Sequence, residues 1–431
     1  MNIIYIHTHD TGRYIEPYGY DISTPHLMEF AREGTLFRNA FCAAPTCSPS
    51  RAALLTGMSP HSSGMLGLAH RGFALNDYQQ HLVNHLNNNG YETALCGVQH
   101  VAKYDKIKEQ IGYDKIITSK ENTDLHNAES AAEYIKNTGD NPFFLSMGMV
   151  NTHREYPELD DSINQEYVKT PEPIFDTEAT RKDMARYKLS VQKVDKCVGK
   201  VINALKDCGK YEDSLVLFTT DHGLAFPFMK CNLFDSGIGI SLIMKQPFQN
   251  DSGKAVDSLI SQIDIFPTIC DIAKIEQPAW LEGKSFLPVL ENEKEEIREE
   301  IFAEVTFHAA YEPMRCIRTK RYKYIKLFFD HHDIVPANID DSYTKSFLLD
   351  KGLLERKREH EQLYDLYFDP NERNNLIEDN DYQKVYQDLK KRLNSWMEKT
   401  DDPLLKGYVE KPEGARVNKK SCISPTENDF E

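Results

Sequence analysis

Residues 47–57 of this chain read CSPSRAALLTG, a cysteine followed by the start of a helix. Ser48 suits the N-cap and Pro49 the first helical position, so we expect a helix to begin over Ser50 to Leu55. Its free backbone amides, together with Arg51, would hold a tetrahedral oxyanion such as sulfate or phosphate beside the cysteine. The alternative is a buried cysteine ahead of an ordinary capped helix.

Apolar, β-rich runs alternate with helical patterns over the first two thirds of the chain. The expected strands are Ile3 to Ile6, Glu92 to Gly97, Phe143 to Val150, Ser214 to Thr220 and Ile240 to Met244, and the expected helices are His26 to Glu33, Tyr78 to Asn88, Asn127 to Asn137 and Thr177 to Lys206. This alternation predicts an α/β fold in which helices cover both faces of a sheet.

A charged run from Glu291 to Glu300 reads as a surface helix or a linker. It divides the chain into a larger α/β domain, residues 1–295, and a smaller α+β domain, residues 296–431. In the smaller domain we expect an antiparallel sheet and an amphipathic helix packed on it. The strands are Ile301 to Val305, Met314 to Thr319 and Arg321 to Leu327, the helix is Asp381 to Lys399, and the polar residues 411–431 are expected to be loosely ordered.

Polar side chains follow two of the expected strands directly. His9 and Asp10 come after the first strand, and Asp221 and His222 come after the strand that ends at Thr220. Open α/β sheets place their ligands at the carboxyl ends of strands, so these side chains are candidates for a shared site. Taken singly, each is as easily explained by a turn or a satisfied polar group.

The run from Cys47 to Gly57 resembles the signature of type I sulfatases, Cys-x-Pro-Ser-Arg followed by Thr-Gly, in the alkaline-phosphatase-like superfamily. In that family a maturase oxidises the cysteine to formylglycine, so the resemblance implies that a formylglycine-generating maturase acts on Cys47. It also implies the family's fold, a large mixed sheet flanked by helices with a smaller C-terminal domain of antiparallel sheet plus helix. The implied activity is hydrolysis of sulfate esters or sulfamates in the larger, catalytic domain.

The resemblance further implies one divalent metal ion, held by Asp10, Asp221, His222 and the modified residue 47. Calcium is the expected ion. His9 stands where the family commonly has its first aspartate, and an imidazole does not replace an oxygen ligand on calcium with equal affinity. Zinc and manganese are therefore alternatives, as is a position for His9 outside the ligand set, and magnesium also stays open.

Three further parts of the sequence match residues that complete the pockets of the family: Gly97 to His100, Val150 to Arg154 with its strand-end histidine, and Lys230. The segment Gly97 to His100 resembles Gly-Lys-x-His, but Val98 replaces the lysine and one positive charge is missing. Arg154 could compensate for that lysine, and each histidine taken alone could be structural. By the resemblance, the catalytic residues are Cys47, Arg51, His100, His153 and Lys230.

Within the sulfatases, the chain is most similar to the heparan N-sulfatase group. The supporting segments are Thr24 to Leu27, Leu36 to Phe41, Gly64 to Leu68, Thr306 to His308 with Pro313 to Arg315, and Gln362 to Leu376. The resemblance implies a sulfated glycan as substrate, such as one that carries N-sulfoglucosamine. Arg154, Glu304, His308 and Arg315 are candidates for substrate binding, and for the last three a packing role is equally open.

As the family chemistry implies, hydrated formylglycine attacks sulfur while the metal and the cations neutralise the other oxygens. His153 would protonate the leaving oxygen or nitrogen and His100 would take up the proton that releases sulfate, although the two roles are interchangeable from the sequence. Two other functions stay open. The motif Asp221-His222-Gly223 and the lost first aspartate favour a phosphonate monoester or phosphodiester hydrolase of the same superfamily, and the missing lysine suggests a catalytically silent glycan-binding protein.

The composition limits the partners that the protein can bind and the cellular compartment in which it occurs. The net charge of −16 argues against nucleic-acid binding, and no apolar run is long enough to span a membrane. Nine scattered cysteines without metal-like spacing favour a reduced compartment. Met1 is followed at once by an apolar strand, so we expect a cytoplasmic protein, or a periplasmic or secreted one if a leader has been removed. The sequence leaves a homo-oligomer open.

Overall fold

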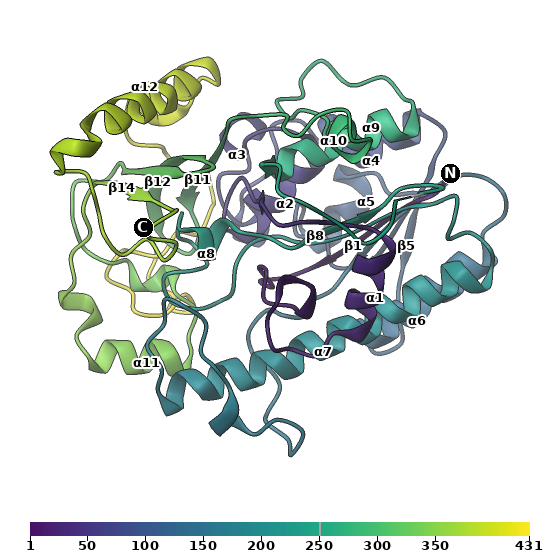
Figure 1. The fold of residues 1–431 in the computed structure, drawn as a ribbon, viewed down its shortest axis with the longest axis horizontal. Coiled ribbons are helices and arrows are strands. Elements are labelled where there is room, and N and C mark those ends of the chain that lie inside the picture. Colours follow the sequence, from purple (N-terminus) through teal and green to yellow (C-terminus); the bar gives the residue numbers. More distant parts are fainter. Residues whose placement is uncertain (250) are drawn as a thin grey trace.

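The computed structural model describes residues 1–249 and 251–431. An eight-stranded mixed sheet forms the centre of the larger lobe (Figure 1). In spatial order its strands are β5 (Lys115–Ile117), β4 (Glu92–Gly97), β6 (Phe143–Gly148), β1 (Ile3–Thr8), β7 (Leu215–Thr220), β8 (Leu242–Lys245), β2 (Thr35–Phe37) and β9 (Lys254–Val256). The first five run parallel to one another, and β8 is antiparallel to both of its neighbours.

Helices cover both faces of this sheet, which confirms the expected α/β fold (Figure 1). One face carries α1 (Pro25–Glu33), α6 (Asp124–Asn137) and α7 (Glu178–Asp207), and the other carries α2 (Cys47–Thr56), α4 (Leu82–Asn88) and α9 (Ile265–Ala273). Side chains alternate between the faces of a strand. Accordingly, Ile4 and Ile6 of β1 pack in the core on the face that carries α1, α6 and α7, and Ile3 and Tyr5 pack in the core on the opposite face.

Several expected elements differ at their ends. The strand β6 ends at Gly148, two residues before its expected end at Val150. The expected helix from Tyr78 to Asn88 is a 3-10 turn followed by the shorter helix α4, because the ring of His81 caps α4 by accepting a hydrogen bond from Val83 N at 3.1 Å. Local capping by a histidine is a weaker sequence signal than capping by Ser, Thr, Asp or Asn.

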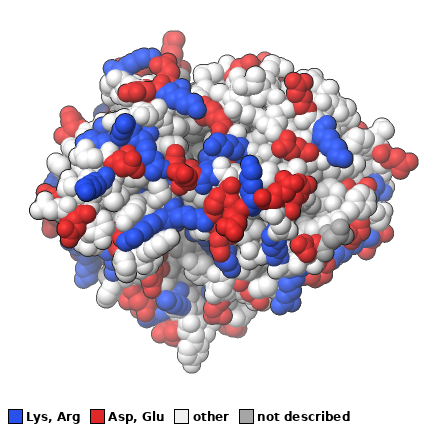
Figure 2. Space-filling view, turned by 45° about the horizontal axis from the view of Figure 1, so that its top comes forward, with Lys and Arg blue, Asp and Glu red and all other residues white. Residues whose placement is uncertain are grey.

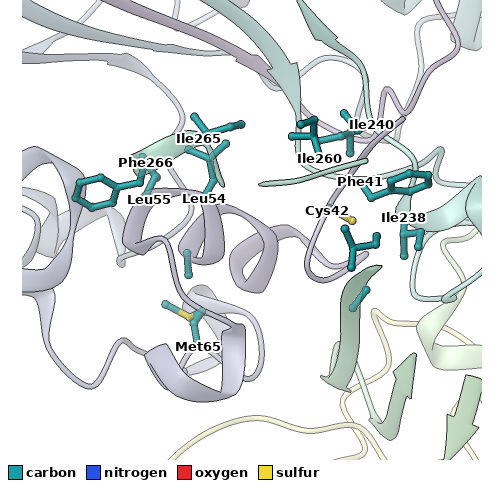
Figure 3. Packing of buried hydrophobic residues seen from close by; sticks show 14 of the residues in the cluster. Phe41, Cys42, Leu54, Leu55, Met65, Ile238, Ile240, Ile260, Ile265 and Phe266 are labelled. Carbon is teal, nitrogen blue, oxygen red and sulfur yellow. The ribbon is translucent and has the colours of Figure 1, made fainter. Parts of the chain in front are cut away.

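The helix α2 begins at Cys47, and not after Ser48 as expected. Thr46 occupies the N-cap position, because the Ser48 hydroxyl is engaged elsewhere and accepts a hydrogen bond from Ala69 N at 3.0 Å. Farther along the helix, Leu54 and Leu55 pack near Ile265 and Phe266 of α9 (Figure 3). These apolar contacts fix the helix so that its first residue, Cys47, lies at the edge of the sheet.

The smaller lobe is a four-stranded antiparallel sheet of β11 (Glu300–Phe307), β12 (Tyr311–Thr319), β13 (Tyr322–Leu327) and β14 (Glu361–Asp365). The amphipathic helix α12 (Gln383–Lys399) packs on β12 and β13, as expected, and α11 (Tyr343–Asp350) contacts α7. The strand β14 was not expected. The charged run at residues 291–299, all of which the structure describes, forms no helix and is therefore a linker. The division of the chain between residues 295 and 296 stays a prediction.

The two lobes share one hydrophobic core. A single cluster of buried residues extends from Leu54 of α2 and Phe266 of α9 to Ile317 of β12 and Leu393 of α12. This continuous packing fixes each lobe against the other.

The remaining short helices and strands are β3 (Ala40–Phe41), β10 (Ile260–Ser261), α3 (Pro60–Ser63), α5 (Ile107–Gln110), α8 (Asp235–Ile238) and α10 (Leu287–Leu290).

The expectation of a loosely ordered tail at residues 411–431 is wrong. Val417 and Cys422 are buried, and Asn418 forms bridges to Ala310 and Phe430. Cys422 belongs to a small apolar cluster together with Ala309, Ala310, Val335 and Ala337. The few apolar side chains of the tail are therefore enough to anchor it.

Acidic and basic side chains are interspersed over the face shown in Figure 2. Some of the exposed charges of the molecule are paired, such as Arg38 with Asp257 and Lys106 with Glu109. Among the residues that the structure describes, none of the helices combines the length and the apolar character needed to cross a bilayer.

Candidate active site

Four adjacent parallel strands, β4, β6, β1 and β7, end at one edge of the large sheet. Parallel strands bring the segments that follow them to the same edge, which is where open α/β sheets bind ligands. These segments carry His100, His153, the pair His9 and Asp10, and the pair Asp221 and His222. The edge therefore gathers the strand-end residues that the sequence singled out.

The two aspartates are adjacent because β1 and β7 pair in register up to Thr8 and Thr220. The backbone N–H of Asp10 donates to Asp221 Oδ1 at 2.8 Å, and both side chains are buried. His9 Nδ1 lies 3.0 Å from Asp221 Oδ2. The β1–β7 register thus builds a compact group of two carboxylates and one imidazole.

Cys47 enters this group from the N-terminus of α2. Its Sγ lies 3.5 Å from His222 Nε2, which lies 3.3 Å from Asp10 Oδ1. Burial raises the pKa of the Cys47 thiol, but Lys230 and hydrogen bonds from His222 and His9 outweigh burial, and the pKa falls to about 6. The site thus stabilises negative charge on residue 47.

Two buried cations oppose the two carboxylates. Arg51 Nη2 lies 3.1 Å from Asp221 Oδ2 and donates to Thr8 O at 2.8 Å, and Lys230 Nζ lies 3.0 Å from Asp10 Oδ2. Both cations are nearly inaccessible to solvent, so water screens their charges only weakly. Arg51 also contacts the His7 ring.

Two histidines border the group on its open side. The His153 Nδ1–H donates to Arg154 O at 2.5 Å, so its Nε2 is the nitrogen turned toward Lys230, 3.5 Å away. The ring centroid of His100 lies 4.6 Å from that of His9, edge to face. Burial, together with the neighbouring His9 and Arg51, lowers the pKa of His100 well below its usual value.

The residues present fit a divalent cation. One ligand atom each from His9, Asp10, Cys47 and Asp221 can be chosen so that all lie within 4.8 Å of one another. Apart from the contacts of His9 Nδ1 with Asp221 Oδ2 and of Asp10 Oδ1 with His222 Nε2, these two buried atoms make no hydrogen bond in the part of the chain that the structure describes. Such atoms are costly unless something binds them. His222 lies next to this group but is not one of its four members.

Asp340 belongs to the site although the sequence did not point to it. Its Oδ2 lies 2.9 Å from Lys230 Nζ, so Lys230 is placed between two carboxylates, those of Asp10 and Asp340. Burial raises the pKa of Asp340, but Lys230 outweighs burial and holds the pKa below its usual value. Asp340 follows a 3-10 turn over Pro336–Asn338 in an irregular segment of the smaller lobe.

Glu304 and Arg315 lie elsewhere, in a buried network that joins α3 to the small sheet. Arg315 Nη2 donates to Asp402 Oδ1 at 3.0 Å, and the backbone N–H of His61 donates to Glu304 Oε1 at 2.7 Å. The expectation that Glu304 and Arg315 bind substrate does not fit this placement, because both side chains are buried and paired with each other, Glu304 also with His61 of the larger lobe and Arg315 also with Asp402.

The other two candidates for substrate binding lie beside the group. Arg154 donates from Nε to Ala225 O at 2.8 Å and from Nη1 to Asp183 Oδ1 at 2.9 Å, while its Nη2 lacks a partner among residues 1–249 and 251–431. His308 is buried, and burial followed by Lys230 lowers its pKa well below the usual value. Asp183 neutralises much of the Arg154 charge, so Arg154 is a poor substitute for the lysine missing at position 98.

Comparison with known proteins identifies the family. The sulfatase family model matches residues 1–275, and a model described as N-sulphoglucosamine sulphohydrolase, C-terminal, matches residues 221–342. The chain belongs to the sulfatase family. This sulfatase is therefore a hydrolase of sulfuric esters or sulfamates, in a family that typically uses formylglycine and a metal ion. It is 28% identical to human N-sulphoglucosamine sulphohydrolase over 93% of this chain and 89% of the human protein.

Solved structures share the fold of this sulfatase. A 2-O GAG sulfatase superimposes with a TM-score of 0.73 and 21% identity, over 100% of this chain and 98% of that one. A protein in complex with its substrate D-glucosamine-2-N,6-O-disulfate superimposes with a TM-score of 0.70 and 19% identity, over 93% and 98% of the two chains. The large mixed sheet and the small C-terminal antiparallel sheet are thus those of the sulfatase fold.

Proposed function

We propose that this sulfatase removes sulfate from a sulfated glycan, with an N-sulfoglucosamine residue as the leading candidate. The observation that carries the proposal is the position of Cys47 at the start of α2, 3.5 Å from His222 and beside two carboxylates that Arg51 and Lys230 neutralise. The name of the human relative and the substrate in the disulfate complex support the choice of sugar.

Residue 47 is the proposed nucleophile, after conversion of Cys47 to formylglycine. In its hydrated form, formylglycine would supply geminal hydroxyls, one of which attacks sulfur and gives its proton to a neighbouring carboxylate such as Asp221. The position suits an oxyanion, because the first backbone amides of α2 and the cations Arg51 and Lys230 all favour negative charge there. The same two cations stabilise the negative charge that grows on the sulfuryl oxygens.

His153 is the proposed general acid. Its Nδ1–H is held by Arg154 O, which fixes the ring and leaves Nε2 to carry the proton that the leaving oxygen or nitrogen receives. An amine leaving group needs this proton, since the bond from sulfur to nitrogen breaks only as nitrogen becomes protonated. His100, on the other side of His9, is the proposed base that takes a proton from residue 47 when sulfate departs.

The proposed ion is held by Asp10, Asp221, His9 and residue 47, and it would supply positive charge to polarise the sulfuryl group. Calcium, typical of the family, prefers oxygen ligands, whereas zinc and manganese also accept imidazole. Because His9 Nδ1 is buried within the group, we favour zinc or manganese.

Calorimetric titration of metal-free protein tests this choice directly. Wild type should bind zinc or manganese more tightly than calcium, and His9→Asp, which adds the oxygen ligand common in the family, should reverse the order. A His126→Asp variant, which changes a surface histidine of α6, serves as the control and should keep the wild-type order. Tighter calcium binding by wild type would contradict the proposal.

Asp340 is the proposed positioning residue for Lys230. Without it, Lys230 would pair with Asp10 alone and would draw that carboxylate away from the ion. With Asp340 in place, the lysine contacts only Asp10 Oδ2, and Oδ1 faces His222 and the proposed ion.

The function is tested with protein co-expressed with a formylglycine-generating maturase. Peptide mass spectrometry should find the aldehyde at position 47, and the enzyme should hydrolyse N-sulfoglucosamine. Cys47→Ala should abolish turnover, whereas Cys208→Ala, at the end of α7 and away from the site, should not. Glucosamine 6-sulfate, an aryl sulfate, a phosphodiester and a phosphonate monoester are assayed in parallel.

Preferential turnover of the phosphodiester or the phosphonate would contradict the proposal in favour of the hydrolase alternative. Binding of the glycan without turnover of any of these compounds, by protein in which the aldehyde is present, would favour a catalytically silent binding protein.

A further inference from the structure

We propose that this sulfatase carries a second binding site, for an unsulfated part of a carbohydrate chain, in a cavity of about 620 Å³ apart from the active site. The cavity lies between the loop after β1, the segment of residues 167–172, α7, α8 and the loop that contains Pro370 and Asn371. Its volume falls within the range of ordinary small-molecule sites. The proposal rests on the proposed function, because the ligand is a stretch of the same glycan.

Tyrosine rings line this cavity and remain accessible. Tyr167 is 86% exposed and Tyr20 is 39% exposed, and the Tyr20 ring packs against Tyr14 with the ring centroids 4.5 Å apart. A tyrosine ring offers a broad apolar face together with a polar edge, at a low cost in conformational entropy. The C–H face of a sugar ring can stack on such a surface.

Two of the ion pairs that line the cavity are long, whereas Asp235 of α8 pairs closely with Lys323 and Arg318. Lys169 Nζ lies 3.6 Å from Glu172 Oε1, and Lys188 Nζ lies 3.3 Å from Asp21 Oδ2. Asn371 adds an amide, which donates to Glu172 Oε2 at 2.6 Å. These side chains offer donors and acceptors in near-equal number while their charges cancel, a combination that suits sugar hydroxyls, which both donate and accept.

Arg13 connects the cavity to the active site. It stands three residues after Asp10 on the loop that follows β1, and its Nη2 donates to Ala40 O at 2.9 Å. The buried Nε of Arg13 has no hydrogen-bond partner within the described residues. A ligand oxygen would satisfy this donor, and an unsatisfied buried donor is otherwise costly.

Binding is measured by calorimetry and by saturation-transfer NMR with an unsulfated N-acetylheparosan tetrasaccharide, which lacks the group that the active site would recognise. Wild type should bind with a Kd of about 1 mM or tighter, and the double variant Tyr20→Ala, Tyr167→Ala should bind at least about tenfold more weakly. Tyr104→Ala, which removes an exposed tyrosine that does not line the cavity, is the matched control and should bind as wild type does. Equal melting temperatures show that the variants are folded.

A kinetic comparison gives a second readout. The ratio of kcat/KM for a terminally sulfated tetrasaccharide to kcat/KM for the sulfated monosaccharide should fall at least about fivefold in the double tyrosine variant. Absence of binding by wild type, or equal binding by the double variant, would overturn the second site and leave the proposed function untouched. Binding that depends on the tyrosines would support the second site even if no sulfated probe were hydrolysed, a result that would count against the proposed function alone.

Discussion

Lys230 and Asp340 form an ion pair of 2.9 Å, in which Lys230 is buried and Asp340 partly buried, and this pair joins the larger lobe to the smaller one within the candidate active site. The isosteric change Asp340→Asn removes the charge and keeps the shape. We expect kcat/KM for a sulfated substrate to fall about tenfold or more, because Lys230 then pairs with Asp10 alone. Calorimetry should show weaker metal binding as well, a change that a purely structural role for Asp340 would not cause.

Asp341→Asn is the matched control for this prediction, because Asp341 is the adjacent residue and pairs with Lys345 at a half-exposed position. It should retain wild-type activity and metal affinity. Unchanged metal affinity in Asp340→Asn would refute the positioning role.

His153→Ala should affect substrates according to their leaving groups. With a sulfamate or an alkyl sulfate, whose leaving group needs a proton, we expect kcat to fall by about 10² or more. With an activated aryl sulfate the loss should be much smaller, because the phenolate departs without protonation. Steady-state kinetics on the two substrate types, with His126→Ala as a control, measure the difference, and equal losses would rule out His153 as the acid.

Arg51→Lys should be nearly as harmful as loss of the residue. The guanidinium donates to Thr8 O, pairs with Asp221 and also contacts His7. A lysine ammonium does not reproduce this planar, forked arrangement of donors. We expect kcat/KM to fall by about 10². Arg38→Lys, at an exposed ion pair with Asp257, provides the comparison and should have little effect on kinetics. Near wild-type kinetics for Arg51→Lys would show that charge alone suffices.

The contact of His61 with Glu304 should make stability depend on pH. Burial lowers the pKa of His61, but Glu304 outweighs burial, and the pKa lies above its usual value of about 6.5. A raised folded-state pKa means that this stabilisation is complete below pH 6.5 or so and is lost as the pH rises through the folded-state value.

Urea unfolding of His61→Gln checks this prediction. The free energy of unfolding should drop by about 3 kcal/mol at low pH, where His61 is protonated, and by clearly less in alkaline solution. The surface variant His126→Gln should change the free energy of unfolding by less than about 0.5 kcal/mol at either pH. A cost for His61→Gln that grows with pH would show that the pKa shift has the opposite sign.

Much of the fold and of the site could be predicted, because both depend on short-range patterns. The alternation of apolar strands with helical segments predicted the large sheet, and the rule that ligands lie at strand ends brought Asp10 and Asp221 together before any coordinates. The Cys47 signature is likewise local. What these signals have in common is that each strand, each helix and the cysteine signature can be recognised within its own short segment.

The rest depended on tertiary contacts that a single sequence does not carry. Asp340 lies in an irregular segment, where no periodicity marks a functional side chain, and its role comes from Lys230, distant in the sequence. Ser48 has the chemistry of an N-cap, but its hydroxyl oxygen accepts a hydrogen bond from the Ala69 N–H instead. Arg315 has the chemistry of a substrate ligand but pairs with Asp402.

The hydrophobic cluster that runs through both lobes has a consequence for how the molecule comes apart. Because Leu54 and Leu393 belong to one continuous set of buried contacts, neither lobe can lose its packing while the other keeps its own. Heating should give a single cooperative transition, and a protease that cuts the linker near Glu293 should leave the two fragments associated in their native form.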